Sequence, residues 1–335
     1  MLLNPSIMAL ILISGIVSFF MLLAAGFSLQ ILRHWDINSG SEKQLNLEHH
    51  TYLISTILAF CFLAELASLL LFIYNAEQMS GRFVGAMCAT GVLNVNAWGW
   101  PTLFLKISIF FAGAGWLALN RVDNKAHDYP LVRAKYLLLM LILPLVFAEA
   151  VVQTIYFLQM QPDIITSCCG ALFSPEGEGV AAEVSSLEPA TALSGLLVSA
   201  AVSFAAGAWY YFRGGHGVIF ASSSVVFFLL ALVAIVSCIA LYIYEHPHHH
   251  CPFCILKSGH DYIGYALYIP LFLSTSMAVS VGVMSPFRKI PSLSNIIPQQ
   301  SRLLVVWSMA LMLLFLLVVA WSIFSSSLTM LEVWW

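Results

Sequence analysis

The chain has 335 residues, of which 61% are hydrophobic and only 9% are charged. Because soluble domains carry roughly a quarter charged residues, this composition excludes an ordinary soluble protein and predicts that lipid surrounds most of the chain. The formal net charge of -3 comes without a basic stripe or an arginine cluster, which excludes nucleic acid as the expected partner.

Long apolar runs predict a single all-α integral membrane domain over residues 1–335, a polytopic bundle of transmembrane helices. A hydrocarbon core about 30 Å thick is crossed by roughly 20 apolar residues in a helix, which satisfies its own backbone hydrogen bonds in lipid. The runs are too long and continuous for the strands of a barrel. About eight spans are expected, near residues 7–32, 51–75, 102–120, 136–158, 191–212, 217–244, 265–284 and 303–324.

Basic residues divide unequally between the two sides of such a bundle. With eight spans, the loops on one side hold ten of the thirteen lysines and arginines, whereas the loops on the other side hold Arg82 and Lys257. Because positive residues resist export during insertion, we expect the rich side to be cytoplasmic and both termini to lie on the non-cytoplasmic side. The ten residues are Arg33, Lys43, Arg121, Lys125, Arg133, Lys135, Arg213, Arg288, Lys289 and Arg302.

Five of the seven cysteines fall in the loops that are poor in basic residues, whereas Cys61 and Cys238 fall within spans. This segregation predicts that the five loop thiols face an oxidising space, such as the periplasm outside a bacterial inner membrane, where disulfides persist. The five residues are Cys88, Cys168, Cys169, Cys251 and Cys254.

The densest chemistry lies between residues 246 and 261, where Cys251 and Cys254 form a Cys-x-x-Cys pair. In a redox interpretation, the pair closes a small disulfide ring, and nearby imidazolium groups and Lys257 favour the reactive thiolate. Cys251 is then the exchanging thiol and Cys254 its resolving partner.

Histidines crowd around the same pair, so a metal site is an alternative interpretation. Two thiolates and several imidazoles at short spacing are the ligands that copper(I) or zinc prefers. A plain disulfide that staples the loop, with polar histidines at the membrane interface, would also account for these residues. The candidate ligands are His246, His248, His249, His250, Cys251, Cys254 and His260.

The adjacent residues Cys168 and Cys169 form a second cluster, and Cys88 lies in a third loop. Adjacent cysteines can bond to each other only through a strained ring, and strain makes a disulfide easy to reduce. These thiols could pass a disulfide onward from the Cys-x-x-Cys pair in a relay, or Cys88 could form a structural disulfide with one of the adjacent cysteines. Sequence spacing leaves the connectivity open.

Three ionisable residues are expected inside the bilayer, namely Glu65, Lys106 and Glu149. An ionisable group in hydrocarbon costs several kcal/mol unless it is paired or hydrated, so each is a candidate functional residue. One interpretation is a proton relay beside a quinone acceptor, because a buried carboxyl group can exchange protons there. The other is a buried ion pair between Lys106 and Glu149 that ties helices together.

The motif Cys251-Pro252-Phe253-Cys254 beside a membrane span resembles the active pair of quinone-linked disulfide-forming membrane proteins and of vitamin K epoxide reductase relatives. The resemblance implies thiol chemistry with a quinone as electron acceptor. It covers only these few residues, since those families use four or five spans and lack the histidine run before Cys251. It therefore supports a chemical analogy and not membership of either family.

The leading expectation is a membrane thiol-disulfide oxidoreductase or redox relay that faces the periplasm and acts on a thiol protein. Its catalytic thiols would be the five loop cysteines, and quinone is the candidate cofactor. The second expectation is binding or transport of copper, zinc or another soft metal, with a periplasmic metal carrier as partner. The third is a membrane anchor subunit for a periplasmic redox protein or cytochrome.

Overall fold

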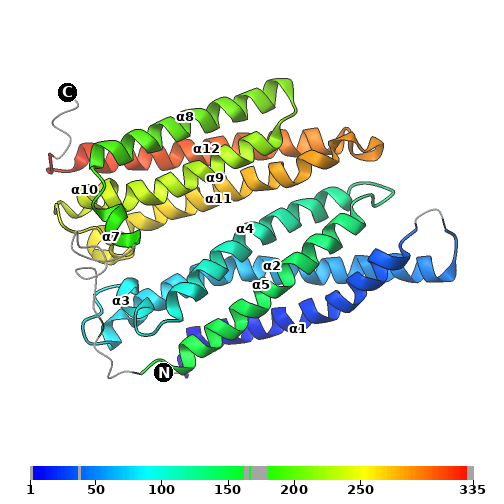
Figure 1. Ribbon diagram of the computed structural model, residues 1–335, viewed down its shortest axis with the longest axis horizontal. Helices are drawn as coiled ribbons and strands as arrows, with labels where there is room; N and C mark the ends of the chain where they lie inside the picture. Colours follow the sequence, from blue (N-terminus) through cyan, green and yellow to red (C-terminus); the bar gives the residue numbers. More distant parts are fainter. Residues whose placement is uncertain (1–2, 37–38, 162–165, 167–179, 330–335) are drawn as a thin grey trace. The chain divides into compact units, whose positions relative to one another are not determined.

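The computed structural model describes residues 3–36, 39–161, 166 and 180–329 (Figure 1). Throughout these residues the regular structure is helical, without strands. Eight helical segments are long and apolar enough to cross a membrane, so the expected all-α class and the expected number of spans are confirmed. These segments are Pro5–His34, Glu42–Arg82, Gly99–Asp123, Val132–Leu158, Pro189–Arg213, Gly217–Tyr244, Ile263–Lys289 and Ile296–Ser325.

Short helices continue some of the spans or lie between them. The π-helix η2 (Ile235–Ile239) joins α9 to α10 within the sixth span, and the 3-10 helix η3 (Cys254–Leu256) lies in the loop that follows. The α-helices are α1 (Pro5–His34), α2 (Glu42–Met79), α3 (Ala89–Leu93), α4 (Gly99–Asp123), α5 (Val132–Leu158), α7 (Val180–Ser185), α8 (Pro189–Arg213), α9 (Gly217–Ala234), α10 (Ala240–Tyr244), α11 (Ile263–Met284) and α12 (Ile296–Ser325).

Apolar side chains cover much of the outer surface of the long helices. Leu12, Phe60 and Phe212 are 58%, 69% and 78% exposed, respectively. A water-soluble protein would bury such side chains against its own core, whereas lipid solvates them without cost. The outer surface therefore indicates an integral membrane protein in contact with a bilayer.

Several helices extend beyond the apolar runs from which the spans were predicted. α2 begins at Glu42 and α12 at Ile296, ahead of the expected starts near 51 and 303. Hydropathy marks only the part of a helix that matches the hydrocarbon, and polar turns at its ends can continue the same backbone hydrogen-bond ladder. Local sequence fixes some ends directly, because Asn4 accepts a hydrogen bond from the Ser6 N–H at the start of α1.

The chain divides into two compact units. The first comprises the described residues within 1–75, 96–160 and 283–301, and the second comprises those within 76–95, 161–282 and 302–335.

The core of the first unit is formed by α1, α2, α4 and α5. α5 contacts both α1 and α4, as the ribbon view shows (Figure 1). The rings of Phe62 on α2 and Trp116 on α4 lie 4.9 Å apart, and those of Phe27 on α1 and Tyr136 on α5 lie 5.8 Å apart. Aromatic ring contacts thus join α2 to α4 and α1 to α5.

The second unit packs α8, α9, α11 and the greater part of α12 together. The rings of Phe227 on α9 and Phe315 on α12 meet edge to face at 5.8 Å. The Ser308 hydroxyl donates a hydrogen bond of 2.7 Å to the Ser274 carbonyl oxygen, joining α12 to α11. Small residues allow the close helix contacts that are typical of membrane bundles.

Candidate functional site

Three cysteines from two loops of the second unit converge on one point. Cys88 directly precedes α3, Cys251 lies between α10 and η3, and Cys254 begins η3. Their three sulfur atoms all lie within 4.8 Å of one another. Cys88 and Cys251 are fully buried, and Cys254 is only 6% exposed. We call these three residues the thiol cluster.

Cys251 contacts both a neighbouring thiol and a hydroxyl group. Its Sγ lies 3.3 Å from the Sγ of Cys88 and 3.2 Å from the Oγ1 of Thr90. An S–S bond is about 2.05 Å long, so the two sulfurs are in non-bonded contact, and no disulfide joins any of the described cysteines. The Thr90 hydroxyl can donate a hydrogen bond to a Cys251 thiolate, which would favour the charged form.

A buried carboxylate and a lysine hold the two cysteine loops together. Glu77 accepts a hydrogen bond of 3.0 Å from the Ala89 N–H, next to Cys88. Lys257, three residues after Cys254, lies 3.5 Å from Glu77 and also donates a hydrogen bond to the Met87 carbonyl oxygen. The ion pair therefore fixes the separation between the Cys88 loop and the Cys-x-x-Cys loop.

Two tyrosines fix the backbone of the Cys-x-x-Cys loop. The Tyr244 hydroxyl, at the end of α10, donates a hydrogen bond of 2.6 Å to the Cys251 carbonyl oxygen. The Tyr268 hydroxyl, on α11, donates one of 2.8 Å to the Pro252 carbonyl oxygen. The two helices that flank the loop thus each contribute one donor to it, which fixes the backbone that carries Cys251.

The histidines near the thiol cluster make other contacts. His250 contacts the Val236 carbonyl oxygen through its Nδ1 at 3.0 Å, and the ring of His249 stacks on Tyr244 at 4.1 Å. His260 approaches Tyr244 at 4.7 Å, while His246 and His248 are exposed. Burial lowers the pKa of both His250 and His260 below its ordinary value, so both favour the neutral imidazole. Among the described residues, the side chains placed to share a metal ion are therefore the three cysteines of the thiol cluster, without a histidine.

Known protein families, curated proteins and solved structures provide no match to this chain.

Cys168 and Cys169, through which the sequence predicts a relay, lie outside the described residues. Thr166, which is described, donates its N–H to the Val84 carbonyl oxygen at 3.0 Å, four residues before Cys88.

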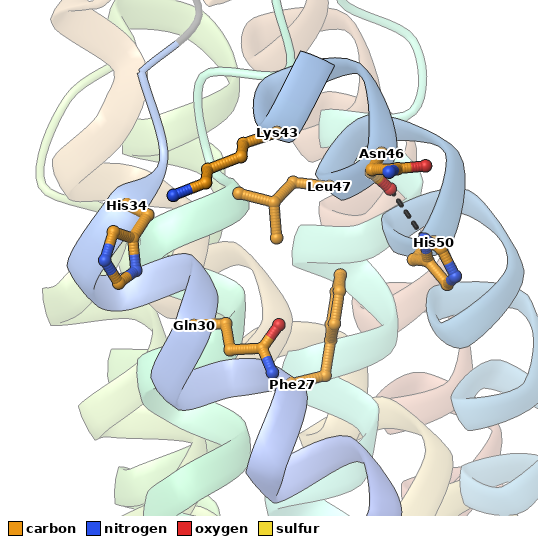
Figure 2. Close-up of a pocket in the computed structure, with 7 residues that line it drawn as sticks. All are labelled: Phe27, Gln30, His34, Lys43, Asn46, Leu47 and His50. Carbon is orange, nitrogen blue, oxygen red and sulfur yellow. Dashed lines mark hydrogen bonds between the residues drawn. The ribbon is translucent and has the colours of Figure 1, made fainter. Parts of the chain in front are cut away.

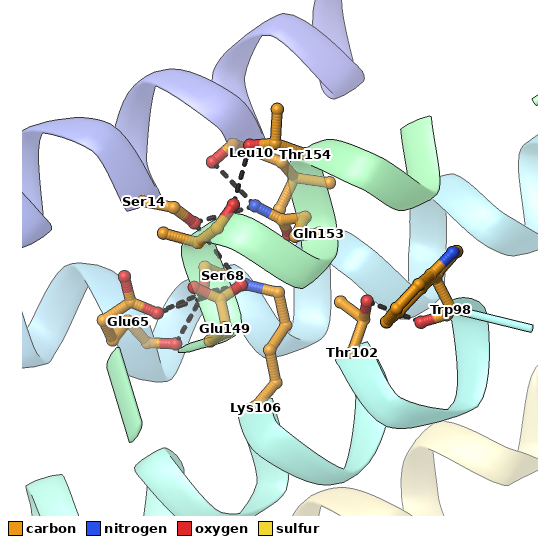
Figure 3. Close-up of polar contacts among 11 residues, drawn as sticks. Leu10, Ser14, Glu65, Ser68, Trp98, Thr102, Lys106, Glu149, Gln153 and Thr154 are labelled. Atoms are coloured by element: carbon orange, nitrogen blue, oxygen red, sulfur yellow. Dashed lines mark hydrogen bonds and ion pairs between the residues drawn. The ribbon is translucent and has the colours of Figure 1, made fainter. Parts of the chain in front are cut away.

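The first unit contains a buried polar cluster that includes all three predicted intramembrane charges (Figure 3). The Lys106 Nζ lies 2.7 Å from Glu149 Oε1 and 4.0 Å from Glu65 Oε2. Lys106 also donates a hydrogen bond of 3.0 Å to Ser68. The three charged side chains are at most 1% exposed. The cluster joins α2, α4 and α5 and is considered further below.

A second buried ion pair lies where α4 and α5 approach their connecting loop. Lys135 Nζ is 2.8 Å from Asp123 Oδ2, and both side chains are fully buried. Lys135 also donates to Asn120 Oδ1 at 3.2 Å, and Asp123 Oδ1 accepts the Leu131 N–H at 2.8 Å. The sequence predicts Lys135 in a cytoplasmic loop, whereas the structure places it in α5. The sequence feature that indicates this pair is Asp123, an acidic residue at the end of α4 that can pair with a buried lysine.

A pocket of about 570 Å³ lies between α1 and α2 in the first unit (Figure 2). Two of its lining residues are hydrogen-bonded to each other, His50 through its Nδ1 to the Asn46 carbonyl oxygen at 2.7 Å. The predicted site residues do not contribute to its lining, which is formed by Phe27, Gln30, His34, Lys43, Asn46, Leu47 and His50.

Sequence reasoning missed four residues that shape the thiol cluster, namely Glu77, Thr90, Tyr244 and Tyr268. Glu77 lies two residues beyond the expected end of the second span and is the acidic residue nearest to Cys88 in sequence. Thr90 follows Cys88 by two positions. The spacing of Glu77 and Thr90 from Cys88 is not distinctive. Their roles depend on contacts between the Cys88 loop and the Cys-x-x-Cys loop, which lie far apart in the chain.

Proposed function

We propose that the chain is a membrane protein that binds a thiophilic metal ion, with copper(I) as the favoured ion, through Cys88, Cys251 and Cys254. The observation that carries this proposal is the convergence of three buried sulfur atoms within 4.8 Å. Buried thiols from separate loops have few reasons to meet at such distances unless they bond to each other or share a ligand.

The separations between the sulfurs suit a shared ion. Thiolate sulfur binds zinc at about 2.3 Å, and soft ions of similar size give sulfur atoms that lie roughly 3.7–4.0 Å apart around one centre. The Cys88–Cys251 separation of 3.3 Å and the limit of 4.8 Å for the group bracket that range. Small side-chain rotations are therefore enough to place all three sulfurs on one ion.

The chemistry of the donors favours copper(I) over zinc. Structural zinc sites use four ligands and often include imidazole, whereas copper(I) is soft, prefers thiolate and accepts three such ligands. The group comprises three sulfurs, while His250 is bonded to a backbone carbonyl oxygen and His249 stacks on Tyr244.

The unequal distribution of basic residues supports the proposed orientation, with the thiol cluster on the periplasmic side of a bacterial inner membrane. At that face the protein would accept a soft metal ion from a periplasmic carrier, or deliver one to it. The exposed residues His246 and His248 precede the buried thiols and could present a first, weaker binding point to such a carrier.

Anaerobic titration of the purified protein with copper(I), in competition with a chromophoric chelator, tests the proposal. We expect one tightly bound ion per chain in the wild type, and a loss of at least 10-fold in affinity in each of Cys88→Ser, Cys251→Ser and Cys254→Ser. Cys61→Ser and Cys238→Ser are matched controls, because both cysteines are buried within spans, and they should bind as the wild type does. Wild-type affinity in all three cluster variants would refute the proposal.

The contact between Cys88 and Cys251 favours thiol-disulfide exchange as a second candidate function. An oxidised Cys88–Cys251 pair would take two electrons from a dithiol protein, which leaves with a new disulfide, and a membrane quinone would accept two electrons and two protons when the pair is reoxidised. Cys254 could resolve a mixed disulfide at Cys251. Intact mass analysis with alkylation distinguishes the candidates, because exchange requires a form with one disulfide in cells, whereas metal binding requires thiols that alkylate once the ion is removed.

A further inference from the structure

The first unit holds a buried cluster with more acidic than basic groups, independently of the thiol cluster (Figure 3). α2 contributes Glu65 and Ser68, α4 contributes Lys106, and α5 contributes Glu149. All four residues are at most 2% exposed. They lie in helices that are long and apolar enough to cross a membrane. We call these four residues, together with Ser14 and Gln153, the charge cluster.

The formal charges in the charge cluster do not balance. With every group ionised, one ammonium faces two carboxylates, which leaves one excess negative charge in a low-dielectric interior. The nearby titratable group Cys61, one turn before Glu65 on α2, cannot supply positive charge. By contrast, the buried pair of Lys135 and Asp123 matches one cation to one anion. An uncompensated buried charge is strongly unfavourable, so the charge cluster needs one more positive charge than its side chains provide.

Three oxygen atoms of the charge cluster also lack hydrogen-bond donors. Glu65 Oε1, Glu149 Oε2 and Gln153 Oε1 are buried and have no donor among the described residues. The amide nitrogen of Gln153 is directed to α1, where it donates to Ser14 at 2.7 Å. A buried acceptor without a donor costs about 1–3 kcal/mol. A proton on a carboxyl oxygen turns an acceptor into a donor and cancels the excess charge at the same time.

The geometry favours Glu65 as the residue that carries this proton. Glu149 lies 2.7 Å from Lys106 and also accepts a hydrogen bond of 3.4 Å from the Ser14 hydroxyl, so its negative charge is directly compensated. Glu65 is 4.0 Å from the ammonium, and Ser68, which bonds to both Lys106 and Glu65, stands between them. A metal cation is disfavoured, because the ammonium of Lys106 would repel it at this range.

We infer that the charge cluster is a binding site for one exchangeable proton, carried by Glu65 and balanced by the Glu149–Lys106 ion pair. A protonatable carboxyl group among membrane-spanning helices lets a protein couple its conformation to proton uptake and release. The inference does not depend on the thiol cluster, since a variant without Cys88, Cys251 and Cys254 should retain it.

Infrared difference spectroscopy of the purified protein at neutral pH tests the inference, because a protonated carboxyl group has a C=O stretching band that shifts in D₂O. We expect this band in the wild type, its loss in Glu65→Gln and its retention in Glu65→Asp. Glu188→Gln is the matched control, since Glu188 is exposed and should not contribute. Lys106→Met should add a second protonated carboxyl group, because Glu149 then loses its counter-charge.

Three results would overturn the inference. The first is the absence of a D₂O-sensitive band in the wild type, which needs no variant to fold. The second is a band that survives in folded Glu65→Gln, which would place the proton elsewhere. The third is a band that appears only when Na⁺ is withdrawn, which would show that the site is built for a cation.

Discussion

The Sγ atoms of Cys88 and Cys251 lie 3.3 Å apart although the two residues are separated by 163 positions. The contact extends the local Cys-x-x-Cys motif to a three-sulfur group, and it depends on the packing of two loops against each other. A two-thiol loop in isolation would favour an ordinary disulfide, whereas a third thiol provides the coordination that a soft metal ion needs. The stability of the loop packing should therefore govern the affinity of the site.

Removing the lysine that joins the two loops should weaken metal binding without removing a ligand. Lys257→Met eliminates the contacts with Glu77 and Met87, and substitutions of supporting residues typically reduce metal affinity by about 10-fold to 100-fold. Copper(I) competition titration measures the effect. Arg82→Gln is the matched control, because Arg82 is an exposed cation in the same unit. The copper(I) affinity of this variant should equal that of the wild type. Equal affinities in both variants would show that the loops hold their positions without this ion pair.

The Lys106–Glu149 pair should display strong coupling in a double-mutant cycle. Lys106→Met leaves the buried Glu149 carboxylate without its cation, so that Glu149 must take up a proton, and should lower the free energy of unfolding by about 3–5 kcal/mol. Lys106→Met combined with Glu149→Gln should be less destabilising than the sum of the single substitutions, since no unpaired charge remains at Glu149. Unfolding in detergent, followed by circular dichroism, provides the free energies. Strict additivity would mean that the two side chains do not interact.

The buried Asp123–Lys135 pair, which links α4 to α5, should contribute to the free energy of unfolding about as much as the Lys106–Glu149 pair. Asp123→Ala removes the partner of a fully buried ammonium and an acceptor for the Leu131 N–H, so a loss of about 3–5 kcal/mol is expected. Asp128→Ala in the same loop is the control, because Asp128 is exposed and should change stability by less than about 0.5 kcal/mol. Thermal unfolding of the two variants measures this difference. Equal unfolding midpoints for Asp123→Ala and Asp128→Ala would contradict a stabilising role of the Asp123–Lys135 ion pair.

Close packing in the second unit depends on Gly282 of α11. A Cβ atom at this position would lie 2.5 Å from the Cβ of Ala221 on α9, so Gly282→Ala must push the helices apart. Overpacking of this kind costs about 1–3 kcal/mol. Gly195→Ala on α8 has open space and should be neutral or stabilising by about 1 kcal/mol. Chemical unfolding should show a loss of stability for Gly282→Ala and none for Gly195→Ala, and a stabilising Gly282→Ala would contradict this packing.

Composition and hydropathy predicted much of the fold. Eight apolar runs are confirmed as eight long helices, because a backbone in lipid has almost no alternative to a helix. The predicted ends were less accurate, as α2 shows by beginning at Glu42, since polar turns at a helix terminus leave no trace in hydropathy. Hydropathy predicts Lys135 in a loop for the same reason, whereas its ion pair with Asp123 allows it to be buried in α5.

The candidate site was predictable only in part. The Cys-x-x-Cys spacing identified Cys251 and Cys254, but the selection of Cys88 as their neighbour required the three-dimensional structure. Glu77 and Thr90 were not predicted, because contacts between distant loops have no signature in a single sequence. The histidine run suggested metal ligands by composition, whereas the structure gives His249 and His250 contacts with Tyr244 and Val236.

X-ray absorption spectroscopy of the copper-loaded protein tests the central claim most directly, because it identifies the atoms bound to the metal. We predict copper(I) surrounded by three sulfur neighbours in the wild type and by fewer in Cys88→Ser. A first coordination sphere of nitrogen and oxygen atoms, or a sulfur environment that does not change in Cys88→Ser, would contradict a metal centre built from Cys88, Cys251 and Cys254.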